Sequence, residues 1–111
     1  MIIRSAYLEG DVADEERETF DRQMRETVVA AIRTYPRIRD VRLRRLARGE
    51  EGAPNIYMIF DLYFDSLDDM DEALASETRR LVRACIQEAM PSFRGRVYHL
   101  VFEEPKADVG H

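Results

Sequence analysis

The segment 56–65 limits the possible folds more than any other part of the chain. Its side chains alternate with the two-residue period of a β-strand that lies half buried in a sheet. One face of this strand is entirely apolar and consists of Met58, Phe60, Leu62 and Phe64. The other face is mixed and consists of Tyr57, Ile59, Asp61, Tyr63 and Asp65. We therefore expect helices to cover the first face of the sheet and to leave the second face bare.

The remaining elements can be placed on either side of this strand. Three further strands are predicted over 2–8, 38–48 and 96–103, and helical spacing is found over 20–35, 67–74 and 78–90. Pro36 and Pro91 end the helical regions, and Ser66 with Asp69 resembles a capping box. The resulting order, β-α-β-β-α-β, is the split βαβ or ferredoxin-like pattern. It predicts an α+β fold with a four-stranded antiparallel sheet and helices on one face.

Length and charge narrow the classes of protein further. The 111 residues suit one domain, which we place at 1–105, followed by a polar C-terminal tail at 106–111. The net charge of −5 argues against a nucleic-acid or membrane partner. We see no signal peptide, and a single cysteine fits a reducing compartment, so we expect a cytoplasmic protein. No cysteine cluster or paired-histidine spacing is present, so we expect no metal and no other cofactor.

The bare face of the predicted sheet requires a cover. Tyr57, Ile59 and Tyr63 place apolar and aromatic surface there, and such a surface favours association. A second copy of the chain supplies a matching face, so we expect a homodimer. The alternative is a monomer whose outer face is simply amphipathic.

Three stretches resemble the EthD family, named for a protein of ethyl tert-butyl ether degradation. They are Ala53–Tyr57 with the strand after it, the turn Phe64-Asp65-Ser66-Leu67, and Ala73-Leu74-Ala75-Ser76. Phe20-Asp21-Arg22 also resembles the start of that family's first helix. The resemblance implies a dimeric α/β barrel, with two sheets facing each other and a pocket beneath each. Relatives with this architecture include cofactor-independent monooxygenases, haem-binding enzymes and lactone isomerases.

One departure from the family pattern bears on activity. Many EthD-like proteins carry a His-x-Pro near the end of the first helix. Aligned from Phe20, those positions are Val28 and Ala30 in this chain. A proton-transfer residue of the family is therefore missing at this position.

Asp61 is a candidate catalytic base because it lies between apolar residues on the mixed face. A carboxylate in an enclosed apolar pocket has a raised pKa and can accept a proton. Strand parity, however, places Arg42 or Arg44 on the same face as Asp61. We therefore favour an ion pair with one of these arginines, and parity alone does not say which. An anion site made by Arg42 and Arg44 is the alternative for that pair.

His99 is the second candidate base, and it shares a strand face with Val97 and Val101. An imidazole there can transfer a proton near neutral pH or simply bond a neighbour. We expect Tyr57, Ile59 and Tyr63 to line a ligand pocket on the bare face.

The sequence therefore favours a homodimeric domain that binds a small apolar or aromatic molecule between the two sheets. A cofactor-independent monooxygenase or isomerase, with Asp61 or His99 as base, is one alternative. A purely structural or interaction dimer without a ligand is the other.

Overall fold

The computed structural model describes residues 1–105, so the predicted tail at 106–111 lies outside the described residues. The strands are β1 (Ile2–Val12), β2 (Asp40–Arg45), β3 (Ile56–Phe64) and β4 (Phe93–Glu103). The first helical region joins α1 (Asp14–Arg22), a π-helical segment η1 (Gln23–Val28) and α2 (Val29–Ile32). The second contains α3 (Leu67–Leu74), α4 (Thr78–Ala89) and a 3-10 turn, η2 (Met90–Ser92).

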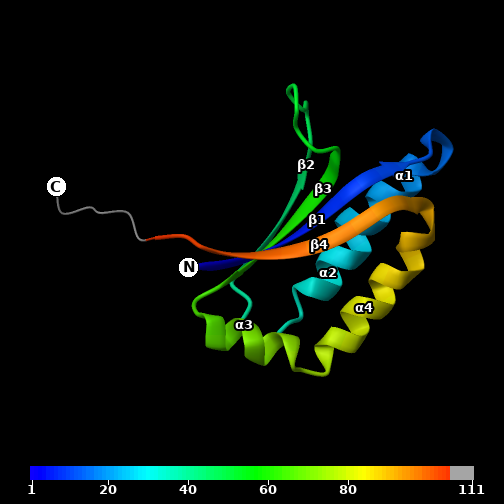
Figure 1. The fold of residues 1–111 in the computed structure, drawn as a ribbon. Coiled ribbons are helices and arrows are strands. Elements are labelled where there is room, and N and C mark those ends of the chain that lie inside the picture. The colour runs from blue at the N-terminus through cyan, green and yellow to red at the C-terminus, as the bar shows by residue number, and fades with distance from the viewer. Residues whose placement is uncertain (106–111) are drawn as a thin grey trace.

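The strands form one antiparallel sheet in the order β2-β3-β1-β4. The helices lie on one side of this sheet, as Figure 1 shows, so the other side is bare in the single chain. The predicted α+β, ferredoxin-like β-α-β-β-α-β fold is confirmed. None of the helices in residues 1–105 is long and apolar enough to span a bilayer.

The core lies between β3 and the first helical region, as the alternation in 56–65 predicts. Met58 and Phe64 are fully excluded from solvent, and Phe20, Met24 and Val28 from the helices are nearly so. Ser66 caps α3 by accepting a hydrogen bond from the backbone N–H of Asp69 at 3.1 Å. The predicted helix start at Ser66 is therefore confirmed.

The first strand is longer than we expected. We expected a strand over 2–8, but β1 continues through Gly10, which pairs with Gly95 on β4, as far as Val12. Both glycines have positive φ, at 151° and 154°. A Cβ atom on Gly95 would lie 2.0 Å from the carbonyl oxygen of Glu9, so only glycine lets the two backbones approach this closely.

A β-bulge in β3 changes the direction of one predicted site residue. Leu8 pairs with Met58 and Glu9 pairs with Ile56, which leaves Tyr57 as an extra residue on β3. The alternation is broken there, and Tyr57 packs edge-on against Phe20 of α1. Tyr57 therefore lies on the helix side of the sheet and not on the bare face.

We expect Gly95→Ala to destabilise the protein by about 2 kcal/mol or more, because the methyl group must displace backbone at a φ that alanine avoids. Chemical denaturation measures this loss. Gly49→Ala is the matched control: a Cβ atom there meets nothing closer than 3.8 Å, and we expect a change within about 0.5 kcal/mol. Equal effects of the two substitutions would contradict the close approach of β1 and β4.

Candidate functional site

Asp61 is held in an ion pair on the bare face, as we favoured from parity. Its carboxylate is almost fully buried and accepts hydrogen bonds from Arg44 Nε at 2.7 Å and from the Ser5 hydroxyl at 2.5 Å. Arg42 lies directly opposite Asp61 in the ladder, but Arg44, two residues further along β2, is its partner. The hydrogen bond to Asp61 raises the pKa of Arg44. These contacts fit an anchoring carboxylate better than a free base.

Arg42 is also paired on this face. Its Nε donates to Asp40 at 3.0 Å, and its guanidinium lies 5.0 Å from the ring centroid of Tyr63. The hydrogen bond from Arg42 and the backbone N–H of Val41 together lower the pKa of Asp40. Both arginines of the predicted anion site therefore already have carboxylate partners.

The bare face carries an open depression of about 400 Å³, and several of the predicted site residues line it. It is lined by Ile3, Ser5, Tyr7, Arg42, Arg44, Asp61, Tyr63 and Phe102. Ile59 shares this face by parity but does not line the depression. The structure therefore brings Arg42, Arg44, Asp61 and Tyr63 together and separates them from Tyr57 and His99.

Tyr57 serves the helix side of the molecule. Its hydroxyl donates to the carboxylate of Asp21 on α1 at 2.6 Å, and Arg45 Nη1 lies 3.2 Å from the same carboxylate. Burial and this hydrogen bond raise the pKa of Tyr57 to about 12. Tyr57 thus ties the bulge of β3 to α1, and it lines neither the depression nor the cavity described next.

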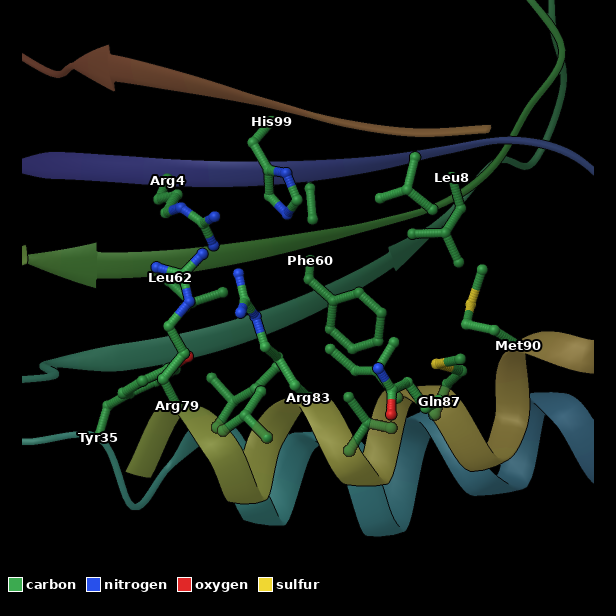
Figure 2. A pocket seen from close by; sticks show the side chains of 17 residues that line it. Arg4, Leu8, Tyr35, Phe60, Leu62, Arg79, Arg83, Gln87, Met90 and His99 are labelled. Carbon is green, nitrogen blue, oxygen red and sulfur yellow. The ribbon is translucent and has the colours of Figure 1, made fainter. Parts of the chain in front are cut away.

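A more enclosed cavity, of about 360 Å³, lies between the sheet and the helices. Figure 2 shows it bounded above by the strands and below by the helices. Most of its wall is apolar: Ala6, Leu8, Met24, Val28, Ile32, Phe60, Leu62, Val82, Ile86, Met90 and Val97. The polar lining is limited to Arg4, Tyr35, Arg79, Arg83, Gln87 and His99.

His99 belongs to this cavity and not to the depression that contains Asp61. His99 pairs with Ala6 on β1, whereas Asp61 pairs with Ser5, the neighbouring residue whose side chain points the other way. Asp61 and His99, the two candidate bases, therefore do not share a pocket, because the sheet lies between the two side chains. In Figure 2 the imidazole points from β4 down into the cavity.

Three arginines gather below His99. Arg4 projects from the helix side of β1, and Arg79 and Arg83 lie one turn apart on α4. Figure 2 shows their guanidinium groups turned toward one another at one end of the cavity. Burial, and next the charge of Arg79, lower the pKa of Arg4.

The same surroundings keep His99 neutral. Desolvation, followed by repulsion from Arg4 and Arg79, lowers the pKa of His99 from 6.5 to about 4. The residue remains open to solvent at the sheet edge, so water can still reach the ring. At neutral pH the imidazole therefore has a free lone pair that can accept a hydrogen bond or a proton.

The π-helical segment η1 contributes Met24 and Val28 to the cavity wall. Such segments are frequent at functional sites. Val28 is almost fully buried and presents an apolar wall to the cavity. Within the described part of the chain, no three His, Cys, Asp or Glu side chains are grouped so that they could hold a metal ion.

Sequence reasoning missed the arginine cluster, although a signal was present. Arg4 follows Ile2 by two residues, so it interrupts the apolar face of the first strand. Arg79 and Arg83 share the side of α4 that carries Val82 and Ile86. Arg4 is a charged residue on the apolar face of a strand, and Arg79 and Arg83 are charged residues on the apolar face of a helix. Together they indicate a polar region within the space between the strand and the helix.

The lowered pKa of His99 predicts acid sensitivity. Below pH 6.5 the unfolded chain protonates this imidazole, whereas the folded protein does so only near pH 4, so stability falls as the pH drops through this window. We expect wild type to lose stability relative to His99→Gln between pH 7 and pH 4.5, as measured by urea unfolding of both proteins. A wild type that gains stability relative to the variant in acid would contradict this assignment.

The comparisons with known proteins concern the fold. No model of a known protein family matches the sequence, and no curated protein matches it. Several solved structures do match over nearly the whole chain. An EthD-family protein from Bacillus halodurans C-125 has 20% identity and a TM-score of 0.71, over 95% of this chain and 100% of that one.

Two other structures illustrate the range of similar proteins. An antibiotic biosynthesis monooxygenase has 14% identity and a TM-score of 0.61, over 95% of this chain and 99% of that one. A dimeric protein of unknown function and ferredoxin-like fold from Bacteroides fragilis NCTC 9343 has 16% identity and a TM-score of 0.64, over 93% and 96%. Identities this low establish the fold alone, and this chain therefore has an EthD-like, ferredoxin-like fold.

Proposed function

We propose that this protein is a homodimeric domain that binds a small, mostly apolar organic molecule in the cavity between the sheet and the helices. The observation that carries the proposal is the cavity itself, of about 360 Å³, with mostly apolar walls and with its three arginines at one end (Figure 2). Small-molecule sites are usually built in this way. The proposal moves the ligand from the bare face, where we first expected it, to the helix side.

The dimer is proposed from the bare face. Leu100 and Phe102 of β4 are 45% and 43% exposed there, next to the stacked rings of Tyr7 and Tyr98. Apolar surface of this kind on a sheet favours a partner. The description of a Bacteroides fragilis protein of similar fold as dimeric agrees with this proposal.

A second candidate function is enzymatic, and the position of His99 favours it over Asp61 as the base. His99 faces the cavity, whereas Asp61 is bonded to Arg44 and Ser5 on the other side of the sheet. In an isomerisation, the imidazole would take a proton from a carbon next to a carbonyl and return it to another carbon, and an arginine would stabilise the enolate formed in between. This reaction needs no cofactor and no second substrate.

Filling the cavity with a larger side chain is expected to weaken ligand binding. Ile86 lines the cavity from α4, whereas Leu81 on the same helix is 52% exposed and does not line it. We expect Ile86→Trp to weaken the binding of 1-naphthoate or 1-naphthalenemethanol at least tenfold, and Leu81→Trp to leave it unchanged.

The measurement is the NMR spectrum of methionine methyl groups. Met24 and Met90 line the cavity, and Met58 is buried in the core and does not line it, so the first two resonances should shift most when a probe binds. Equal binding by wild type and Ile86→Trp would place the site elsewhere. Failure of both probes to shift Met24 and Met90 in wild type would favour an interaction dimer without a ligand.

The dimer has its own matched pair of variants. Leu100 and Val101 are neighbours on β4 with nearly equal exposure, 45% and 46%, but they point to opposite faces of the sheet. We expect Leu100→Glu to shift the protein toward monomer, because it places charge in the proposed interface, and Val101→Glu to leave the dimer intact. Native mass spectrometry or light scattering measures the mass. A dimer that persists in Leu100→Glu but dissociates in Val101→Glu would place the interface on the helix side.

A further inference from the structure

We propose that the ligand of this cavity carries an oxyanion, a carboxylate or a phosphate, that Arg4, Arg79 and Arg83 bind at one end of an otherwise apolar space. The inference rests on the proposed function and names the chemical class of the ligand.

The first argument is the pairing of charges. In the described part of the chain, none of these three arginines forms an ion pair with a carboxylate, whereas Arg42 and Arg44 on the bare face both do. Other arginines without such a partner, among them Arg80 and Arg94, lie outside the cavity. Arg4, Arg79 and Arg83 differ because all three line the same cavity, and Arg4 and Arg79 are partly buried there.

The second argument is the unfavourable state of the empty cluster. Arg4 and Arg79 are partly buried, and burial and mutual repulsion lower the pKa of Arg4. Like charges that converge without a counter-charge destabilise a fold, and such groups are commonly found where function requires them. An oxyanion would remove the repulsion and accept several charge-assisted hydrogen bonds at once, because guanidinium groups present paired N–H donors.

The third argument is the polarity of the cavity along its length. In Figure 2, Arg4 and Arg79 lie at one end, Phe60 lies in the middle, and Leu8 and Met90 lie at the other end. A ligand that matches this arrangement has a charged head and an apolar or aromatic body. An inorganic anion would contact the arginines at one end of the cavity and leave the apolar part of the cavity unfilled.

His99 stands beside the proposed anion site and acts there as a positioning residue or as the base of the enzymatic candidate. The charged groups that face it are Arg4 from β1 and Arg79 from α4, and both keep it neutral. A bound oxyanion offsets their charge, so the pKa of His99 must rise when the ligand binds. Ligand binding and protonation of His99 are therefore linked.

The test compares three probes with the same ring system: 1-naphthoate, 1-naphthyl phosphate and neutral 1-naphthalenemethanol. We expect at least one anion to bind at least tenfold more tightly than the alcohol, by calorimetry and by the shifts of the Met24 and Met90 methyl resonances. The stronger of the two anions identifies the head group as carboxylate or phosphate. Equal affinity for all three probes would overturn the anion site and leave the binding cavity in place.

Variants on one helix separate a specific site from general charge. Arg83 and Arg80 are both exposed residues of α4, but only Arg83 lines the cavity. Arg83→Gln should weaken the anion about tenfold with little change for the alcohol. Arg80→Gln, which removes the same charge, should change neither. Equal losses in both variants would overturn the site in favour of non-specific attraction.

Two further readouts exclude a merely structural role for the cluster. Arg4→Gln should raise the melting temperature of the ligand-free protein while it weakens anion binding, because it relieves repulsion. The pKa of His99, followed by NMR, should rise in the presence of the bound anion and stay unchanged with the alcohol. A lower melting temperature with unaltered anion binding would assign Arg4 to the fold and overturn the inference. If neither anion nor alcohol shifts Met24 and Met90, the proposed function itself fails.

Discussion

The packing of one helical layer on one face of the sheet determines the rest of this structure. Phe20, Met24 and Val28 meet Met58 and Phe64 in a nearly dry core, and each such side chain contributes roughly 1.5–3 kcal/mol by its burial. Because helices cover only one face of the sheet, the side chains of the other face must either be polar and contact solvent or be covered by a partner. The helix layer also does not fill the space beneath β4, where Val97 keeps 40% of its surface exposed and lines the cavity. Core, bare face and cavity are thus three results of the same one-sided arrangement.

Local periodicity was sufficient to predict the fold, because the direction of a side chain within one strand depends only on its own neighbours. The strict alternation over 56–65 identified the core face, and the order of elements identified the topology. Pairing between strands is less local. Parity placed both Arg42 and Arg44 on the face of Asp61, but only the register and the reach of the side chain select Arg44, which lies diagonally from Asp61. The sequence therefore predicted that Asp61 forms an ion pair with an arginine of β2, but it could not identify Arg44 as that arginine.

Two features could not be predicted, for physical reasons. The bulge at Tyr57 results from the pairing of β3 with β1, and the residues of β3 alone carry no sign that their alternation is interrupted. The cavity depends on which side chains from three strands and both helical regions fail to fill the space between them, and no local pattern encodes this. Consequently, the sequence placed His99 with Val97 on one face of its strand but could not say whether that face is shared with Asp61, since relating residues of different strands requires the register.

Charge is distributed differently on the two sides of the sheet, and this difference suits two different partners. On the bare face, Arg42 and Arg44 are neutralised by Asp40 and Asp61. A face with its charges already paired can be buried against an identical copy without leaving isolated ions, which would otherwise oppose association. On the helix side, the arginines of the cavity have no carboxylate partner among the described residues, so that side retains a positive potential inside an apolar space. A small anion can enter this space and supply the missing charge. The same protein can therefore use one face of its sheet for assembly and keep the other for a ligand.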